Sequence, residues 1–239
     1  MKTNADYKNA ALAALKGNWA PAVLATVIFL LVTAAIVLPA EIPLLKMQGG
    51  GMEDILSSAS SGDITGMMAF YSEMTSWSSL GTLLQVFLYN VFTVGLYVAF
   101  LKLLRNGDNR VTSNMVDVAF RNYWHKVWGM LLMQIFIVLW TLLFIIPGIV
   151  KAFSYAMTPY ILEENPELSA NDAIDRSRAM MKGHKFDLVW LLLSFIGWGF
   201  LCLFTFGIGY LWLTPYMQTS VAAFYEDVKA DYEVNGGLI

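Results

Sequence analysis

Few side chains in this 239-residue chain could do chemistry, and they do not form a catalytic pattern. The two histidines, His125 and His184, lie far apart, and the single cysteine, Cys202, sits within an apolar segment. Metal sites and nucleophilic triads need several such groups at defined spacings. Glu163 and Glu164 are adjacent and would point about 100° apart on a helix, so we interpret them as part of a solvated loop. We expect no catalytic residue, no metal and no cofactor.

Lys151 is the one charged residue within the long apolar segment 127–162. A cation at membrane depth is costly unless it reaches the headgroups, pairs with an anion or lines a cavity. Only a short stretch separates Lys151 from the turn signal Pro147-Gly148, so its side chain can extend to the outer headgroups. A cavity that binds an anion is the alternative interpretation.

Two Thr-Pro-Tyr motifs, Thr158-Pro159-Tyr160 and Thr214-Pro215-Tyr216, each follow a Gly-Ile pair. Proline removes a helical hydrogen bond, and such a break is tolerated at membrane depth where neighbouring helices or water satisfy the freed carbonyl group. A shared kink for packing is the simpler interpretation, and a binding cavity is the alternative. The candidate cavity or kink residues are therefore Lys151, Thr158, Pro159, Tyr160, Thr214, Pro215 and Tyr216.

Four basic residues, Arg176, Arg178, Lys182 and Lys185, lie close together in the sequence. Such clusters attract anionic lipid headgroups, and each basic residue near the membrane surface contributes about 1 kcal/mol. We predict that this cluster is a surface for lipid or for a partner protein. Ion pairing with the aspartates of the same segment is the alternative.

The composition indicates an integral membrane protein. Hydrophobic residues make up 57% of the chain and charged residues 14%, and the mean hydropathy is +0.57, whereas soluble domains contain about 25% charged residues. Too few charged side chains remain to cover a surface that faces water. The formal net charge of -3 lacks the basic excess that nucleic-acid binding requires, so nucleic acid is not an expected partner.

Long uncharged segments predict the membrane spans, since about 20 apolar residues cross a bilayer as a helix. Two of these segments are too long for one pass and carry turn signals near their middle, at Pro147-Gly148 and at Gly207-Ile208-Gly209. We therefore predict six transmembrane helices. Their ranges are 20–40, 80–104, 127–146, 149–162, 188–205 and 208–226.

Basic residues are distributed unequally between the two predicted faces of the membrane. Thirteen of the fifteen lysines and arginines fall in segments that six passes place on the same side as both termini. The positive-inside rule makes that side cytoplasmic. We accordingly expect an external loop at 41–79 and a cytoplasmic tail at 227–239.

A repeated pattern divides the chain into three similar parts. The motifs Lys16-Gly17-Asn18-Trp19, Arg121-Asn122-Tyr123-Trp124 and Lys182-Gly183-His184-Lys185 each precede a predicted hairpin. Capping boxes before the first and third motifs, and helical periodicity, predict amphipathic inner helices at 4–16, 112–123 and 169–182, along the membrane surface. The expected fold is one all-α membrane domain, 1–239, of six transmembrane helices in three hairpins, each preceded by a cytoplasmic surface helix.

Several stretches of the chain carry a family resemblance. They are Ala14 to Trp19, Ile146 to Tyr155, Met157 to Leu162, Glu167 to Ala170, Ser177 to Lys185, Leu193 to Trp198 and Tyr210 to Tyr225. These stretches resemble a bacterial integral membrane family of unknown function, domain-of-unknown-function family 975. A looser similarity is to the membrane domain of bacterial glycerophosphodiester phosphodiesterases. The resemblance implies an all-helical module of the bacterial cytoplasmic membrane in lipid surroundings, and it supplies no catalytic residues.

Three functions remain open on these grounds. The leading hypothesis is a non-enzymatic scaffold or regulatory module that binds membrane lipids, or another membrane or cytoplasmic protein, through its inner helices and basic cluster. The second is a permease or channel for a small or lipid-like solute. The third is a membrane-embedded lipid-modifying enzyme. The interiors of the predicted spans contain no acidic residue, which weakens a proton-coupled carrier of the carboxylate type.

Overall fold

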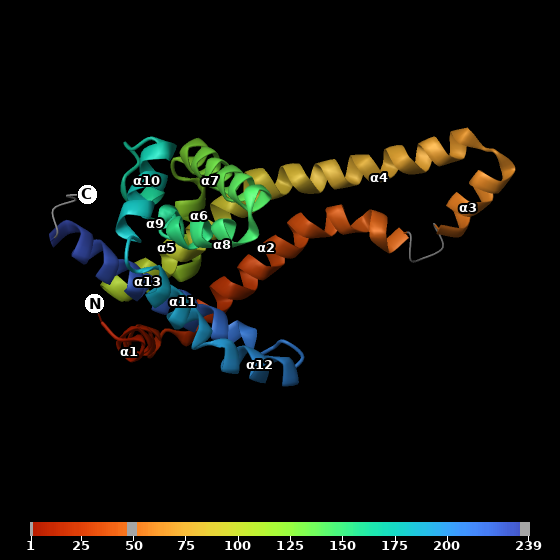
Figure 1. Cartoon of the computed structure of the whole chain (residues 1–239). Coiled ribbons are helices and arrows are strands. Elements are labelled where there is room, and N and C mark those ends of the chain that lie inside the picture. Colours follow the sequence, from red (N-terminus) through yellow and green to blue (C-terminus); the bar gives the residue numbers. More distant parts are fainter. Residues whose placement is uncertain (1, 47–51, 235–239) are drawn as a thin grey trace. The chain divides into compact units, whose positions relative to one another are not determined.

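The computed structural model describes residues 2–46 and 52–234, and the regular secondary structure in these ranges is helical (Figure 1). The helices are α1 (Asn4–Leu15), α2 (Trp19–Lys46), α3 (Met52–Ser61), α4 (Ile64–Leu84), α5 (Asn90–Asn106), α6 (Val111–Phe120), α7 (Tyr123–Leu143), α8 (Ile145–Ser154), α9 (Thr158–Glu164), α10 (Ala170–Met180), α11 (Lys185–Leu193), α12 (Ile196–Phe204) and α13 (Tyr210–Val234). The predicted all-α class is confirmed. Two compact units form: a main unit of Met1–Phe29 with Asn90–Ile239, and a second unit of Leu30–Tyr89.

Five helical segments are long and apolar enough to cross a membrane: Trp19–Leu38, Ser79–Asn106, Tyr123–Leu143, Ile145–Glu164 and Lys185–Phe204. The sixth predicted span, 208–226, largely coincides with α13, which is not among these segments. Polar residues in its middle, such as Gln218 and Thr219, lower its hydropathy, and the helix continues into charged residues. The arrangement of six spans in three hairpins is therefore not confirmed, whereas a multi-pass membrane protein is compatible with these helices.

The segment predicted as an external loop, 41–79, is largely helical where the structure describes it. Helix α2 continues to Lys46, and α3 and α4 follow in the second unit. Asp63 caps α4 by accepting a hydrogen bond from the Gly66 N–H group at 3.0 Å. Hydroxyl groups within α4 donate to carbonyl groups one turn earlier, as Ser79 does to Thr75 at 2.6 Å. A Ser-rich composition therefore did not exclude a helix here, because the helix itself satisfies the hydroxyls.

Both predicted capping boxes begin helices as expected. Thr3 and Asp6 exchange side-chain to backbone hydrogen bonds at the start of α1, and the Ser169 hydroxyl accepts from the Asp172 N–H group at 3.2 Å at the start of α10. The inner helix predicted at 112–123 is the shorter α6, whose cap position has no side-chain hydrogen bond. After α1, α6 and α10 the chain reverses at Gly17, Asn122 and Gly183, and each of these residues has a left-handed backbone conformation.

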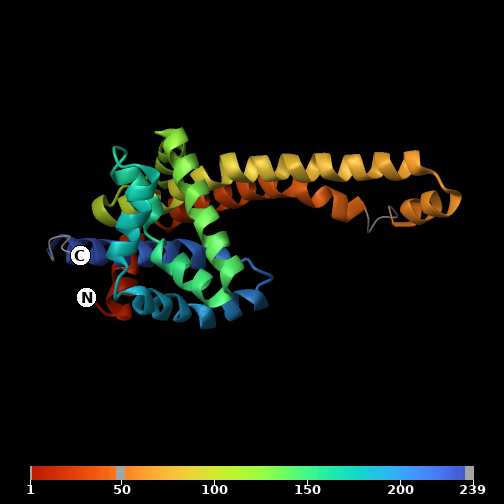
Figure 2. The ribbon, with the colours of Figure 1, turned by 45° about the horizontal axis from the view of Figure 1, so that its top comes forward.

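The ends of the hairpins differ in how well their turns were predicted. The α7–α8 turn lies at Phe144, and Pro147 and Gly148 belong to the first turn of α8. Proline is accepted there because the first N–H groups of a helix have no intrahelical partner. The α12–α13 turn coincides with the predicted glycines, and Phe206 and Gly207 adopt left-handed conformations in it. Within the main unit, α7 runs across the direction of α13 (Figure 2), so these hairpins are not parallel.

Tyrosine rings lie at the centre of the main unit. Tyr160 stacks on Tyr225 with ring centroids 4.6 Å apart and on Tyr97 at 5.9 Å. Close backbone approach holds α5 against α6, because a Cβ atom added to Gly95 would overlap the Met115 carbonyl group. By contrast, the hairpin ends expose large apolar side chains, and Phe206 is 99% exposed. In a membrane protein such surfaces face lipid.

Candidate functional site

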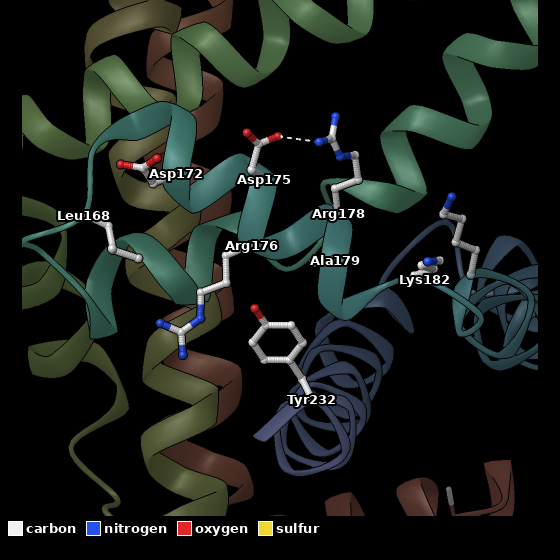
Figure 3. A pocket seen from close by; sticks show the side chains of 9 residues that line it. Leu168, Asp172, Asp175, Arg176, Arg178, Ala179, Lys182 and Tyr232 are labelled. Atoms are coloured by element: carbon white, nitrogen blue, oxygen red, sulfur yellow. Dashed lines mark ion pairs between the residues drawn. The ribbon is translucent and has the colours of Figure 1, made fainter. Parts of the chain in front are cut away.

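The four residues of the predicted basic cluster line one pocket of about 830 Å³ beside α10 (Figure 3). Arg176 and Arg178 come from α10 itself, Lys182 from the turn that follows, and Lys185 from the first position of α11. The remaining lining residues are Leu168, Asp172, Asp175, Ala179 and Tyr232. The structure thus brings together side chains that the sequence placed on one short segment, and we call this site the basic pocket.

Two of the four basic side chains in the basic pocket have protein partners. Arg178 forms an exposed ion pair with Asp175 at 3.0 Å, which Figure 3 shows as a dashed line. Arg176 donates to the side-chain oxygen of Asn165 at 3.0 Å, and its guanidinium group lies 6.0 Å from the centre of the Tyr232 ring. An exposed ion pair such as Arg178–Asp175 contributes little to stability.

Lys182 and Lys185 form no ion pair with any residue that the structure describes. Their ammonium groups are therefore available to an anion that enters the pocket. Arginine adds a planar fork of donors that fits phosphate or carboxylate oxygens in pairs. The basic pocket can thus bind a phosphate-bearing or carboxylate-bearing group. Its lining contains no serine, cysteine or histidine.

Glu163 is the centre of a buried ion-pair network that sequence reasoning missed. Its side chain is 4% exposed, and one carboxylate oxygen lies 2.7 Å from the Lys126 ammonium group, which is fully buried. The guanidinium group of Arg121 pairs with the other carboxylate oxygen. Lys126 also donates to the carbonyl groups of Val118 and Arg121. The interpretation of this segment as a solvated loop is wrong, because Glu163 lies buried in α9 and pairs with Lys126 of α7.

Glu164, the next residue, binds partners from two other helices. Its carboxylate contacts Arg105 of α5 at 2.5 Å and Lys229 of α13 at 2.7 Å, and it accepts a hydrogen bond from the Tyr225 hydroxyl at 2.7 Å. Arg105 also pairs with Glu226. Neither glutamate lines the basic pocket, and the contacts of Glu164 join α9 to α5 and α13.

A signal for this network existed in the sequence. Lys126 and Glu163 flank opposite ends of the same long apolar segment, on the face of the membrane predicted to be cytoplasmic. A helical hairpin brings the two ends of such a segment together. Pairing the charges that flank each predicted hairpin would have identified this pair.

Lys151 contacts aromatic rings. Its ammonium group lies 4.6 Å from the centre of the Trp140 ring and 5.9 Å from that of Tyr155. Contact with a ring face partly replaces hydration of a cation. The nearer ring, Trp140, lies close to the end of α7, whereas Tyr155 follows the end of α8. Extension of Lys151 to the headgroups and a cavity role both stay predictions.

The two Thr-Pro-Tyr motifs have different geometries. Pro159 stands in the first turn of α9, after the α8–α9 break, whereas Pro215 lies inside α13. The Thr219 hydroxyl donates to the Pro215 carbonyl at 2.7 Å. Of the candidate cavity residues, Pro159 lines a cavity of about 370 Å³ among α5, α7, α8, α11 and α13, and Tyr216 lines a separate apolar groove. Lys151, Thr158, Tyr160, Thr214 and Pro215 line neither.

A serine of α10 fills the α8–α9 break. The Ser177 hydroxyl donates to the Ser154 carbonyl at 3.0 Å and accepts a hydrogen bond from the Met157 N–H group at 3.2 Å. Backbone groups freed by a break in an apolar helix need such partners. The same helix therefore supplies arginines to the basic pocket on one face and completes a candidate membrane span on the other.

The histidines belong to no metal site in the described part of the chain, where no group of three potential ligands gathers. His184 lies 3.2 Å from Asp231 and 3.5 Å from Asp187. This contact joins the start of α11 to the end of α13.

Comparison with known protein families gives a match over most of the chain. The family "Protein of unknown function (DUF975)" matches residues 1–154 and 142–232. No curated protein and no solved structure matches the chain. Because these two matches together extend over most of its length, the chain belongs to the DUF975 family of proteins of unknown function.

Proposed function

We propose that this protein is a non-enzymatic multi-pass protein of the bacterial cytoplasmic membrane that binds the phosphate groups of anionic lipids in the basic pocket. The observation that carries this proposal is the convergence of four basic side chains on one open pocket, three of them without an acidic partner among the described residues. Four such residues near a membrane surface contribute about 1 kcal/mol each toward an anionic lipid layer.

The position of the basic pocket in the sequence supports a cytoplasmic location. It lies in the segment 163–187, where the positive-inside rule places the inner face. The inner face of a bacterial membrane is rich in anionic lipid, so charge and location agree. The looser resemblance to the membrane domain of glycerophosphodiester phosphodiesterases stays a prediction, as does the internal repeat.

Lipid analysis of the full-length protein extracted without detergent tests this function. The variant Arg176→Gln/Arg178→Gln/Lys182→Gln/Lys185→Gln is expected to lose the enrichment of anionic lipid that the native protein retains. The control Lys2→Gln/Lys102→Gln/Arg110→Gln removes three basic charges outside the basic pocket and is expected to keep this enrichment. Equal lipid profiles for native protein and pocket variant would overturn the proposal. Loss of a copurifying protein with unchanged lipid would favour the protein-binding alternative.

A permease is the second candidate, because one observation favours it. The cavity of about 370 Å³ carries the polar side chains of Thr93, Tyr97 and Gln218 among apolar walls. A water-filled path there would let a soluble thiol reagent modify a cysteine introduced at Thr93 or Gln218. Protection of both positions, with modification of a cysteine at exposed Asn171, would exclude such a path.

A further inference from the structure

A second pocket of a different character lies between the end of α1, the start of α2 and the α12–α13 hairpin, all within the main unit. Its volume is about 430 Å³, within the range of ligand pockets. Three tryptophans, Trp19, Trp198 and Trp212, line it together with Leu12, Leu201, Cys202, Thr205, Gly209, Leu213 and Tyr216. We call it the tryptophan groove. Its lining carries no charge, so its occupant must be apolar.

The walls of the tryptophan groove are held by close packing of α12 against α13. A Cβ atom added to Gly209 would lie 2.7 Å from the Cys202 sulfur, so only glycine permits this approach. The Tyr210 hydroxyl also reaches the Gly199 carbonyl at 3.4 Å. A groove formed by such contacts exists before its ligand binds, which lowers the entropic cost of binding.

The groove opens among side chains that face lipid. Trp198 is 55% exposed and Trp212 is 49% exposed, and the adjoining α12–α13 turn exposes Phe204 and Phe206 almost completely. Lys185–Phe204 is one of the segments apolar enough to cross a membrane. An acyl chain of the surrounding bilayer can therefore enter from the side without crossing water.

Basic residues lie on α1 next to the groove. Lys8 and Lys16 stand one helical turn before and after Leu12, which lines the groove, so helical periodicity places all three near one face. The Lys8 ammonium group donates to the Ser194 carbonyl at 3.1 Å and lies 4.5 Å from the centre of the Phe195 ring. Phe195 in turn contacts Tyr216 of the groove, with ring centroids 5.1 Å apart. This bond uses one of the three donors of the Lys8 ammonium group, and no other described residue accepts from the remaining two.

We propose that the tryptophan groove binds an acyl chain of an anionic membrane phospholipid, whose phosphate group is held by Lys8 and Lys16. An uncharged aromatic groove that opens to lipid and ends beside two cations matches the two halves of such a molecule. The site shares no residue with the basic pocket, so it does not depend on the function proposed above.

Tryptophan quenching by brominated acyl chains tests this site in the full-length protein. The protein is placed in nanodiscs of phosphatidylcholine that contain a small fraction of either brominated phosphatidylglycerol or brominated phosphatidylcholine. Brominated lipid in the bulk bilayer quenches tryptophan fluorescence equally in both kinds of nanodisc. A site that prefers anionic lipid adds quenching in the phosphatidylglycerol nanodiscs only. We expect this excess to be lost in Trp198→Phe/Trp212→Phe and kept in the control Trp124→Phe/Trp128→Phe, which removes two exposed tryptophans of α7.

The headgroup contacts are tested by Lys16→Gln, an exposed residue that makes no ion pair with the described residues, and by Lys8→Gln. Both variants are expected to reduce the excess quenching while overall quenching by phosphatidylcholine is unchanged. The basic-pocket variant is expected to retain it, so failure of one proposal is distinguishable from failure of the other. Equal quenching by both lipids, or an excess that persists in Trp198→Phe/Trp212→Phe, would overturn the proposed site.

Discussion

Lys126 and Glu163 form an ion pair at 2.7 Å in a site where neither side chain is appreciably exposed. Removing one member of a buried pair leaves an unpaired charge, which costs about 3–5 kcal/mol. We therefore expect Glu163→Gln to lower the free energy of unfolding by about that amount. Denaturant unfolding of the detergent-solubilised protein, followed by circular dichroism, measures the change.

The double variant Lys126→Met/Glu163→Gln provides the control for this prediction. It removes both charges, so its destabilisation should be smaller than the sum for the single variants. The exposed pair Arg178–Asp175 offers the contrast, since Arg178→Gln should change stability by no more than about 1 kcal/mol. Similar losses of unfolding free energy for Glu163→Gln and Arg178→Gln would show that burial does not determine how much this ion-pair network stabilises the protein.

Ser177 connects α10 to the α8–α9 break, where no other described side chain bonds the Ser154 carbonyl or the Met157 N–H group. Ser177→Ala leaves a buried carbonyl group and a buried N–H group without partners, which costs about 1–3 kcal/mol. The same substitution at exposed Ser60 should change the unfolding free energy by less than about 0.5 kcal/mol. Thermal unfolding of both variants, measured by intrinsic fluorescence, checks the difference. Equal midpoints would mean that water enters the break and replaces the serine.

Gly95 and Gly197 are both helical glycines, but their surroundings are opposite. A Cβ atom at Gly95 would overlap the Met115 carbonyl group, whereas no atom lies within 4 Å of one at Gly197. Gly95→Ala should therefore force α5 and α6 apart at a cost of about 1–3 kcal/mol. Gly197→Ala should be neutral or stabilising, by up to about 1 kcal/mol, because alanine favours a helix. A lower thermal midpoint for Gly95→Ala and an equal or higher one for Gly197→Ala, each relative to the native protein, would support this packing.

Asp227 of α13 accepts hydrogen bonds from the Tyr7 hydroxyl at 2.7 Å and from the Lys2 N–H group at 2.8 Å. Burial raises the pKa of Asp227, but these hydrogen bonds outweigh it and hold the pKa below its ordinary value of 3.8. A carboxyl group with a lowered pKa in the folded state stabilises the fold above about pH 4 and loses that contribution as the pH falls through the folded-state pKa.

This linkage predicts how acid affects two variants. Asp227→Asn should lower the thermal midpoint at neutral pH and flatten its dependence on pH below about 4. Tyr7→Phe removes one of the two hydrogen bonds and should have a smaller effect in the same direction. Thermal melts across the acidic range distinguish these outcomes. An unchanged acid dependence in Asp227→Asn would assign the acid sensitivity to other carboxyl groups.

Local features of this fold could be predicted from the sequence, and contacts between distant segments could not. Thr3 and Ser169 cap their helices as expected because capping depends on residues three positions apart. The four basic residues converge because one short segment carries them all. The partners of Glu164, by contrast, come from Arg105 and Lys229, and only the packed helices bring these together. The turn that we predicted at Pro147 lies at Phe144, because proline is also accepted in the first turn of a helix.

A hydrogen bond joins residues near the two ends of the described chain, and this contact constrains the number of membrane crossings. Tyr7 near the start of α1 and Asp227 near the end of α13 are joined by a hydrogen bond of 2.7 Å. Five crossings would place the two ends on opposite sides of the membrane, whereas an even number places them on one side. Their direct contact therefore predicts an even number of crossings, with α13 returning to the side on which α1 lies.

Reporter fusions test this topology directly. A reporter that is active only in the cytoplasm should give signals of the same sense when fused before Lys2 and after Val234, and when inserted at Ala170. Insertion at Ser60 should give the opposite signal, because the one candidate span Trp19–Leu38 separates the start of the chain from Ser60. Opposite signals at the two ends would require an odd number of crossings. The Tyr7–Asp227 contact would then be impossible in a membrane, since a hydrogen bond of this length cannot bridge a hydrocarbon layer about 30 Å thick.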